Sequence, residues 1–411
     1  MTDRPRVVVG VAGGIAAYKA CELVRRFTES GHDVTVVPTQ AALEFVGAPT
    51  WAALSGKPVA ADVWSNVHEV PHVRIGQEAD LVVVAPATAD LLARAAHGLA
   101  DDLLTSTLLT ARCPVVLAPA MHTEMWENAA TEANVAILRE RGTLVIEPAD
   151  GRLTGKDTGR GRLPDPAEIF ETCVGVLQRS RDADGTFARD LVGRRVVVSA
   201  GGTREHLDPV RFLGNRSSGL QGYALARAAA VRGAEVTLIA ANTELPDPSG
   251  VTLLRVGSTA ELQDAVLAAA ADADAVVMAA APADFRPTKV SDTKIKKAGD
   301  GSAPTIELEQ NPDILAGISH DRPRPDAVIV GFAAETGDET GSVLELGRAK
   351  LERKGCDLLV VNDVGGGRVF GEADNQAVIL GCDGTAVDVP RASKVAVAHA
   401  IWDQVVRLLA R

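Results

Sequence analysis

Two glycine-rich turns, about 190 residues apart, constrain the fold of this chain more than any other feature. In the first, the β-branched run 6–11 is broken by Gly13-Gly14, and a stretch with apolar residues on one helical face follows. In the second, the run 195–200 is broken by Gly201-Gly202, and a helix is predicted over 220–232. Strand, tight turn, helix and strand in this order form a βαβ unit with parallel strands. The sequence therefore predicts two such units.

Further buried strands alternate with helices in both halves. They are predicted at 33–37, 81–85, 115–118, 144–146, 235–240, 275–280, 327–331 and 358–361, and an amphipathic helix at 394–409 ends the chain. This alternation predicts the α/β class, with two doubly wound, mostly parallel, Rossmann-like sheets. The polar segment 179–193 lacks periodicity. We expect it to be a linker between a domain at 1–178 and a domain at 194–411.

Composition narrows the function. The net charge of −12 repels a phosphate backbone, so we expect no nucleic-acid partner. The five cysteines are scattered and odd in number, which is typical of a protein in a reducing cytosol. The N-terminus enters a strand directly, and no apolar run reaches the length of a membrane span. We therefore expect a cytoplasmic protein without a membrane partner.

The first turn has the features of a phosphate site. It leaves backbone N–H groups at a helix N-terminus, which is a favourable place for an anion. Its order is not G-x-G-x-x-G, and the second strand is followed by Thr39 where a dinucleotide site would carry an acidic residue. This favours a flavin over NAD. A plain strand-to-helix connection is the alternative.

Polar and apolar side chains follow two further strands. Thr88 comes after one strand, and the segment 119–126, P-A-M-H-T-E-M-W, comes after the next. Ligands bind at this edge of a parallel sheet. Met121, His122 and Trp126 line an isoalloxazine ring or belong to the core. His72 follows a proline in what is predicted to be a short extended run, and is either presented to a cleft or structural.

A lysine-rich run stands out in the acidic second half. Lys289, Lys294, Lys296 and Lys297 fall within nine residues. The run is either a solvated basic loop or an anion trap that closes over a triphosphate as a lid.

Ordered motifs over nearly the whole chain resemble a known pair of families. The first 180 residues are similar to the flavin-containing cysteine decarboxylases through G-G-I-A-A-Y-K, A-T-A-D with H-G-L-A-D-D-L-L, P-A-M-H-x-x-M-W and G-x-G-R-L-x-D-P. The second half resembles phosphopantothenate–cysteine ligases through S-A-G-G-T-R-E, N-R-S-S-G, A-P-A-D-F, K-I-K-K, N-P-D-I-L, G-F-A-A-E-T and A-K-L-x-x-K-G-C-D. The fusion is similar to the bacterial bifunctional enzymes of coenzyme A biosynthesis.

For the first half, the resemblance implies a flavodoxin-like domain that decarboxylates 4′-phosphopantothenoyl-L-cysteine to 4′-phosphopantetheine with FMN. It implies catalytic roles for His72, the base, and for His122 and Lys156. His122 stands where the family has an asparagine, and Thr154-Gly155-Lys156 stands where the family has A-C-G. Either Lys156, Thr154 or water replaces the protonating cysteine, or the reductive half-reaction is impaired. The residues implied at the cofactor are Gly13, Gly14, Ile15, Thr39, Thr88 and Met121.

For the second half, the resemblance implies that CTP activates 4′-phosphopantothenate as an acyl-cytidylate, which L-cysteine then attacks. Asn215 is expected to hold the intermediate, and Lys294, Lys350 and Lys354 are expected to contact the triphosphate. Phe332 is expected to lie at the cytosine and Asp284 to bind Mg²⁺. The CTP residues implied are Gly201, Gly202, Ala280, Ala281, Pro282, Asp284, Lys294, Pro312, Asp313, Ile314, Leu315, Phe332, Lys350 and Lys354.

Two other functions stay open on the residues. One is a two-domain NAD(P)-dependent oxidoreductase, against which the missing G-x-G-x-x-G and ribose-binding acid argue. The other is a ligase whose first domain is a regulatory flavin-binding module. The resemblance also implies a homo-oligomer, a dodecamer built from trimers of the flavin half and dimers of the ligase half, with FMN shared across a trimer contact.

Overall fold

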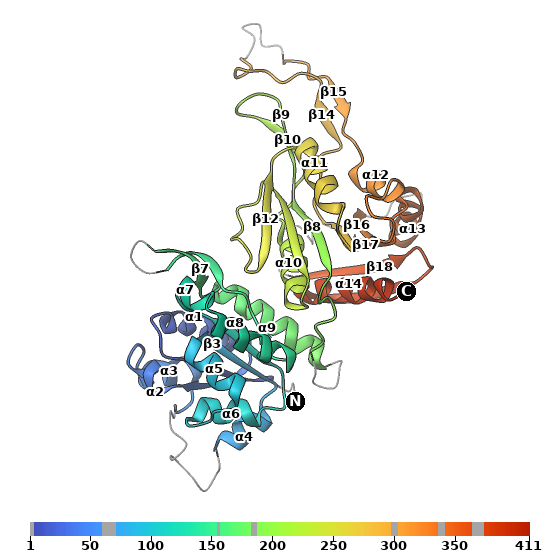
Figure 1. Cartoon of the computed structure of the whole chain (residues 1–411). Coiled ribbons are helices and arrows are strands. Elements are labelled where there is room, and N and C mark those ends of the chain that lie inside the picture. Colours follow the sequence, from blue (N-terminus) through green and yellow to red (C-terminus); the bar gives the residue numbers. More distant parts are fainter. Residues whose placement is uncertain are drawn as a thin grey trace. The chain divides into compact units, whose positions relative to one another are not determined.

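The computed structural model describes residues 4–59, 71–153, 157–181, 187–296, 303–335, 342–363 and 374–411. The chain folds as two compact units, Met1–Arg189 and Asp190–Arg411, which are described separately (Figure 1). No helix among these described residues is long and apolar enough to cross a membrane.

The first unit is built on a parallel sheet of five strands. They are β1 (Arg6–Val11), β2 (Asp33–Pro38), β3 (Leu81–Ala87), β4 (Val115–Pro119) and β5 (Leu144–Val145), in the order β2-β1-β3-β4-β5. This is the flavodoxin-like order, in which the strand sequence reverses between β1 and β3. Every residue of β3 is buried, as expected for a parallel strand covered on both faces.

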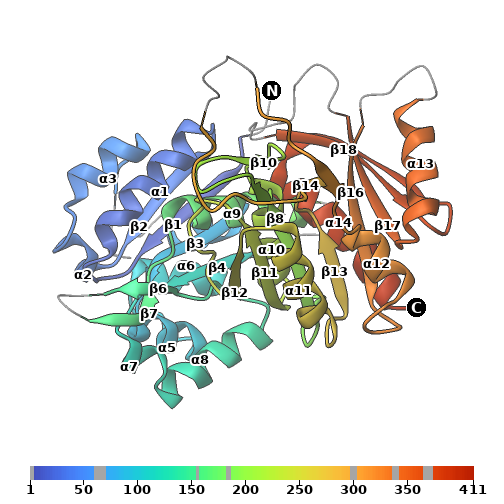
Figure 2. The same ribbon diagram turned by 90° about the horizontal axis from the view of Figure 1, so that it is seen from above.

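Helices cover both faces of this sheet (Figure 2). On one face α1 (Ala17–Glu29) packs against α9 (Pro166–Arg181), where the Phe27 and Phe170 rings meet edge to face at 5.0 Å. On the other, leucines of three helices form one cluster with the strands. The remaining elements are α2 (Gln40–Leu43), α3 (Ala48–Ser55), α4 (Pro71–Glu78), α5 (Ala89–His97), α6 (Leu103–Thr110), α7 (Thr123–Trp126), α8 (Ala129–Glu140) and the hairpin β6 (Ala149–Arg152)–β7 (Thr158–Arg162).

The second unit has an eight-stranded sheet. Its strands are β8 (Arg195–Gly201), β11 (Glu235–Ala241), β12 (Val251–Val256), β13 (Ala275–Met278), β16 (Val328–Glu335), β17 (Leu358–Asp363), β18 (Asp374–Gly381) and β19 (Ala386–Ser393), in the order β12-β11-β8-β13-β16-β17-β18-β19. The first six in this order are parallel and follow the Rossmann order 3-2-1-4-5-6. The last two are antiparallel. The predicted class, two doubly wound and mostly parallel sheets, is confirmed.

Two helix layers cover the second sheet. One layer contains α10 (Leu220–Val231) and α14 (Lys394–Leu409), with the Trp402 indole donating to the Leu225 carbonyl at 2.9 Å. The other contains α11 (Thr259–Ala270), α12 (Ile314–His320) and α13 (Val343–Lys354). Two small hairpins, β9 (Arg204–His206)–β10 (Phe212–Gly214) and β14 (Phe285–Pro287)–β15 (Leu308–Gln310), complete the unit.

Ordered structure extends into both ends of the segment predicted as a linker. The helix α9 continues to Arg181, and Leu191 is fully buried in the core of the second unit. Asp190 forms two hydrogen bonds with Arg232. An apolar side chain and a buried ion pair therefore fix residues 190 and 191, although the surrounding sequence is polar.

A buried guanidinium joins three parts of the second unit. Arg232, at the end of α10, is 0% exposed. It donates to both carboxylate oxygens of Asp190 at 2.7 Å, to the His399 carbonyl at 3.1 Å, and lies 2.9 Å from Asp403. All of these partners come from the start of the unit and from α14, so one side chain connects the two ends of the unit to α10.

Replacing Arg232 by Met should destabilise the second unit by about 3 kcal/mol, because it leaves carboxylates without their cation. Amide hydrogen exchange should accelerate in peptides from α10 and α14. Arg255→Gln is the control: Arg255 is 58% exposed, pairs with Asp247 at the surface, and its loss should change stability by less than about 0.5 kcal/mol. Unchanged exchange in α10 and α14 of Arg232→Met would show that the pairing contributes no stability.

Candidate functional site

Loops that follow the strands of the first unit meet at the carboxyl edge of its sheet. The Ala12 amide, after β1, donates to the Pro86 carbonyl at 3.1 Å, and the Thr39 amide, after β2, donates to the Val11 carbonyl at 2.8 Å. The Ala120 amide donates to the Ala87 carbonyl at 3.1 Å. This is the side of the sheet on which ligands of such folds bind, beside the reversal of strand order between β1 and β3.

The residues expected at the cofactor gather at this edge. Gly13 lies so close to Ala41 that a Cβ atom on it would come within 2.4 Å of the Ala41 Cβ. Thr39 and Thr88 cap α2 and α5, accepting from the amides of Ala42 and Leu91. A hydroxyl that accepts in this way still has its proton to donate. At this edge, Gly14 and Ile15 lie in the turn between β1 and α1, outside any strand, and the two threonine hydroxyls lie at the same edge.

The loop after β4 reaches the same edge and is held by a hairpin. The Met121 amide donates to the Gly161 carbonyl of β7 at 2.9 Å. His122 precedes α7 and makes no capping hydrogen bond through its side chain. The Thr123 hydroxyl is buried without a hydrogen-bond partner. Lys156, with Thr154 and Gly155, falls outside the described residues.

His72 does not lie in an extended run, as the sequence led us to expect, but in the first turn of α4. Pro71 supplies the first residue of that helix, where a missing N–H costs nothing. The His72 carbonyl accepts from the Thr110 hydroxyl of α6 at 2.8 Å. The Nδ1 atom of His72 is buried and has no hydrogen-bond partner among the residues that the structure describes. Figure 1 shows α4 and α6 at the end of the first unit opposite α7 and β7. Within one chain, the described contacts do not bring His72 to the carboxyl edge.

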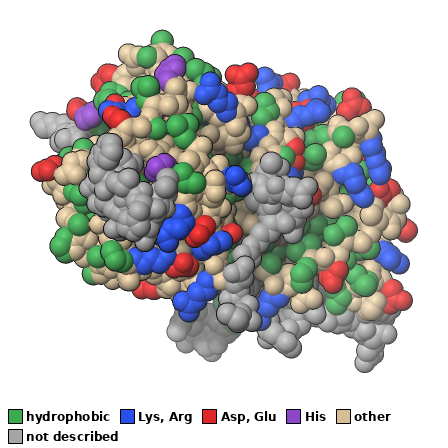
Figure 3. All heavy atoms as spheres, turned by 90° about the horizontal axis from the view of Figure 1, so that it is seen from below, with side chains coloured by type: hydrophobic (Ala, Val, Ile, Leu, Met, Phe, Trp, Pro, Cys, Tyr) green, Lys and Arg blue, Asp and Glu red, His purple; other side chains and the backbone are tan. Residues whose placement is uncertain are grey.

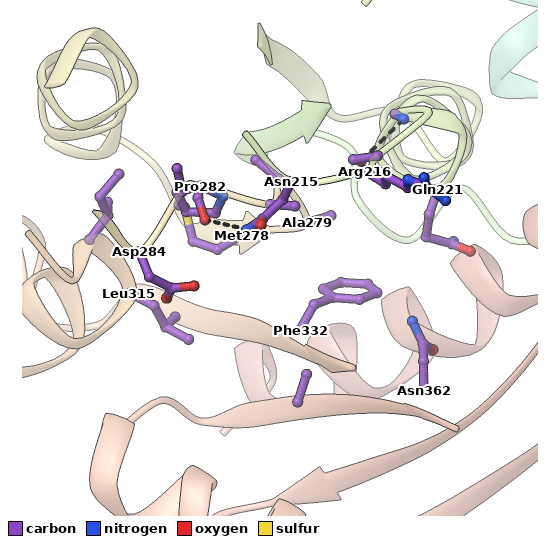
Figure 4. A pocket seen from close by; sticks show the side chains of 18 of the residues that line it. Asn215, Arg216, Gln221, Met278, Ala279, Pro282, Asp284, Leu315, Phe332 and Asn362 are labelled. Carbon is purple, nitrogen blue, oxygen red and sulfur yellow. Dashed lines mark hydrogen bonds between the residues drawn. The ribbon is translucent and has the colours of Figure 1, made fainter. Parts of the chain in front are cut away.

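The second unit contains a cavity of about 380 Å³ at the reversal of its strand order, past the ends of β8 and β13. Figure 4 shows Asn215 and Pro282 near its middle, Asp284 and Leu315 on one side, and Gln221 and Asn362 on the other. Among the residues predicted for the ligase chemistry, those that line it are Asn215, Ala280, Ala281, Pro282, Asp284, Pro312, Asp313, Ile314, Leu315, Phe332, Lys350 and Lys354.

Hydrogen bonds fix the wall after β13. The Asn215 side-chain amide donates to the Pro282 carbonyl at 2.8 Å. Behind it, the Ala283 amide donates to the buried Thr203 hydroxyl at 2.8 Å, and the Asn311 side chain donates to the Ala283 carbonyl at 2.9 Å. Every one of these bonds crosses between segments far apart in the sequence, so the wall is rigid before any ligand arrives.

Gly201 and Gly202 are buried and do not line the cavity. A Cβ atom on Gly202 would lie 2.7 Å from the Asn215 carbonyl oxygen. This second glycine pair therefore lets the Asn215 segment approach the end of β8. In this way it supports the cavity wall from behind.

The cavity has two chemically different ends. The mixed-charge end contains Asp284, Asp313, Lys350 and Lys354. There Lys354 forms an ion pair with Asp313. Burial alone would raise the pKa of Asp313, but the hydrogen bonds from Lys354 and from the Ala316 amide hold that pKa below its ordinary value. The positive charge of Lys354 is thus largely compensated.

The helix end is different. It consists of the α10 N-terminus, residues 219–222, together with Asn362, Asn375 and Lys394. Asn375 is 4% exposed and donates to the Asn362 side-chain oxygen at 3.2 Å. None of the described side chains that line this end is acidic.

Lys294 lies outside the cavity lining and is exposed. The segment that carries it is fixed at its base: the Ile295 amide donates to the Asp208 carboxylate at 3.1 Å, and Arg211 donates to the Ile295 carbonyl at 2.8 Å. The hydrogen bond from Arg211, together with backbone amides, holds the pKa of the buried Asp208 well below its ordinary value. Lys297 falls outside the described residues.

Four residues of the helix end escaped sequence reasoning: Gln221, Asn362, Asn375 and Lys394. Asn362 carried a usable signal, since it is the polar residue that follows the apolar run 358–361. Asn375 and Lys394 carried none, because they reach the cavity through the antiparallel strands β18 and β19.

Comparison with known proteins decides the family. The profile of the family described as "DNA/pantothenate metabolism flavoprotein C-terminal domain" matches residues 191–409, and the profile described as "Flavoprotein" matches residues 1–178. The coenzyme A biosynthesis bifunctional protein CoaBC of Mycobacterium tuberculosis is 59% identical over 419 residues, which cover 100% of this chain and 99% of the relative. The chain belongs to the CoaBC family.

A more distant relative agrees. The CoaBC protein of Vibrio cholerae is 42% identical over 403 residues, or 96% of each chain. A solved structure of the C-terminal domain of a CoaBC protein is 34% identical, covers 54% of this chain and 99% of its own, and has a TM-score of 0.46. As a member of the CoaBC family, the chain is a bifunctional enzyme of coenzyme A biosynthesis with a decarboxylase and a ligase activity.

Replacing Gly202 by Ala should lower the ligase activity about 100-fold, because its Cβ displaces the Asn215 segment from the cavity wall. The decarboxylase activity should stay unchanged. Gly317→Ala in α12 is the matched control, since no atom lies within 4 Å of the added Cβ. Assays of the two activities on separately supplied substrates give the answer, and full ligase activity in Gly202→Ala would contradict the role assigned to this contact.

Proposed function

We propose that the second unit joins 4′-phosphopantothenate to L-cysteine with CTP, and that the first unit decarboxylates the product with FMN. The cavity of the second unit carries the proposal for the ligase. It combines a pre-formed wall, a neutral mixed-charge end and a helix N-terminus free of acidic neighbours among its described lining residues, as activation by a nucleoside triphosphate requires.

The ligase reaction proceeds in two balanced steps. A carboxylate oxygen of 4′-phosphopantothenate attacks the α-phosphorus of CTP, and the bond to the leaving pyrophosphate breaks. The amine of cysteine then attacks the activated carbonyl carbon, CMP leaves, and the amine loses a proton. Asn215 lies in the middle of the cavity, so we assign it to hold the acyl-cytidylate at its α-phosphate.

The charges of the cavity orient the nucleotide. Asp284 and Asp313 would repel the β- and γ-phosphates, whereas the α10 N-terminus attracts them through its backbone amides and dipole. We therefore place the nucleoside at the mixed-charge end, the α-phosphate at Asn215 and the pyrophosphate at the helix end. This arrangement assigns Lys350 and Lys354 to the nucleoside side, whereas the sequence led us to expect them at the triphosphate. Phe332, between the ends, then bounds the sugar and base.

Mg²⁺ fits this cavity as part of the substrate. The described residues contain no group of three metal-ligating His, Cys, Asp or Glu side chains, and Asp284 is the one carboxylate we assign to the ion. Mg²⁺ commonly binds through one or two carboxylates together with substrate phosphates. When bound at Asp284, the ion would screen the charge of the α-phosphate that we place at Asn215.

The carboxyl edge of the first unit fits FMN. Gly13 leaves room for a close backbone approach, and the Thr39 and Thr88 hydroxyls retain protons for a phosphate or ribityl oxygen. FMN, when bound, supplies the oxidation and re-reduction of the cysteine moiety. Met121 borders this site, His122 can donate a hydrogen bond to the substrate carboxylate, and Lys156 is proposed for the final protonation.

We propose that His72 serves as the base in a neighbouring subunit. Its buried, unpaired Nδ1 and its distance from the carboxyl edge support a site completed by a second chain.

Large apolar side chains are also exposed in both units, as at oligomer interfaces. They include Ile15, Tyr18, Phe45, Leu99 and Leu109 in the first unit and Val210, Phe212, Phe285, Val290 and Leu308 in the second. On the face in Figure 3, apolar, basic and acidic side chains are interspersed. With such side chains exposed on both units, we propose that the first units form trimers and the second units dimers, which together build a dodecamer.

The decisive experiment is incubation of the purified protein with 4′-phosphopantothenate, cysteine, Mg²⁺ and either CTP or ATP. Mass spectrometry should detect 4′-phosphopantothenoylcysteine and 4′-phosphopantetheine with CTP. Absence of pyrophosphate with CTP would refute the ligase assignment, and formation of an oxidised aminoenethiol alone would refute an intact decarboxylase.

Lys294→Gln should slow pyrophosphate release about 100-fold, the effect of losing one charged donor at a developing charge. The reason is that the segment carrying Lys294 is anchored at Asp208 through the Ile295 amide, and from this anchor it can close over the triphosphate. Lys57→Gln in the first unit serves as the control, because Lys57 pairs with Asp33 there. Normal release from Lys294→Gln would remove Lys294 from the mechanism.

The shared decarboxylase site predicts complementation between subunits. His72→Ala and Gly13→Val should each abolish decarboxylation, the second by displacing Ala41 and preventing flavin binding. A co-expressed mixed oligomer should recover about a quarter of the wild-type rate, the share of contacts that join an intact His72 to an intact Gly13. Flavin absorbance and light scattering report cofactor content and assembly. No recovery in a correctly assembled mixed oligomer would place both residues in one chain's site.

A further inference from the structure

We propose that Lys394 is a phosphate-binding residue of the ligase site, contacting the β- and γ-phosphates of the nucleotide. The inference rests on the proposed function of the second unit. It adds a charged group from the C-terminal helix α14 to a site that other strands, helices and loops of the second unit line.

The burial of Lys394 is the first observation. Lys394 is the first residue of α14, is only 9% exposed, and belongs to the wall of the cavity. Lysine is among the side chains least often buried. A lysine in the wall of a cavity lies within reach of an anion that binds there, such as a triphosphate.

The position of Lys394 relative to α10 is fixed by side-chain amides. The Gln221 amide, in the first turn of α10, donates to the Lys394 carbonyl at 3.1 Å. Asn375 lies 3.5 Å from the Gln221 oxygen and donates to Asn362 at 3.2 Å. The network ties α10, β17, β18 and α14 together. The backbone at the start of α14 is therefore held beside the first turn of α10, so the lysine begins at the same end of the cavity as the α10 amides.

The distribution of charged side chains in the cavity indicates the direction in which the nucleotide binds. The described acidic side chains of the cavity, Asp284 and Asp313, are both at the mixed-charge end, whereas Lys394 is at the helix end with the positive end of the α10 dipole. When the bond between the α-phosphorus and its bridging oxygen breaks, the electron pair stays on the pyrophosphate. A protonated lysine at that end stabilises the developing charge without giving up a proton.

The test compares CTP with CMP, which lacks the β- and γ-phosphates. Titration calorimetry with Mg²⁺ should show that Lys394→Met weakens CTP binding at least about tenfold, the effect of losing one charge-assisted hydrogen bond. CMP affinity should stay within about twofold. Lys394→Arg should restore part of the CTP affinity. Arg255→Gln, which removes an exposed charge from the same unit, should alter neither affinity.

A second measurement needs no variant. Limited acetylation of the wild-type protein, followed by peptide mass spectrometry, should show that CTP protects Lys394 whereas CMP does not. This result decides the matter if Lys394→Met fails to fold.

The possible failures are distinguishable. If the wild-type protein releases no pyrophosphate from CTP, the proposed ligase function is wrong. If the wild-type protein is active but Lys394→Met binds CTP normally, or if CTP and CMP protect Lys394 equally, only the Lys394 assignment is overturned. An increase confined to the KM for cysteine would likewise place Lys394 at the amino acid and refute a phosphate contact.

Discussion

Close backbone approach at the reversal of strand order is the constraint on which both units depend. In a doubly wound sheet the loops diverge at this point, and a ligand occupies the space that opens. That space forms only if the loop after the first strand makes a tight turn. At this turn Gly13 packs closely against Ala41, and Gly202 packs closely against the Asn215 carbonyl. Each glycine thus positions the segment beside it, and in the second unit it is that neighbouring segment, carrying Asn215, that reaches the cavity.

The same constraint leads to different sites in the two units. In the second unit, a long loop after β8 and the extra strands β18 and β19 surround the reversal point, and one chain builds a complete cavity. In the first, five strands end at an open edge, while His72 lies on α4 against α6. A shallow edge with exposed apolar neighbours such as Ile15 and Tyr18 requires a second surface to exclude water. The geometry of the first unit thus argues for assembly, whereas described residues of one chain line the ligase cavity from several sides.

The sequence predicted the buried parallel strands well because these strands are continuous apolar runs. The helix predicted at 394–409 is observed with the same bounds. The strands β12 and β19 were missed because both lie at the edges of the sheet, where exposed residues interrupt the apolar pattern. The strand β18, which pairs with β19 across a short turn, was missed with it. For the same reason the sequence located Asn215 and the segment 280–284, but not Asn375 or Lys394. The helix α4 was read as extended because Pro71 precedes His72, although proline is equally suited to begin a helix.

The antiparallel extension also gives the ligase half its asymmetry. A six-stranded Rossmann sheet alone would end at β17, and Asn362 would border solvent. Strands β18 and β19 cover that side, bury Asn375 and return the chain so that α14 begins at the cavity. The helix end thereby gains Lys394 beside the positive end of the α10 dipole, and the added positive charge strengthens its attraction for phosphate. The two carboxylates remain at the opposite end, where Asp313 is already paired with Lys354. The cavity is thus polarised along its length, and this polarity sets the direction in which a triphosphate is held and pyrophosphate departs.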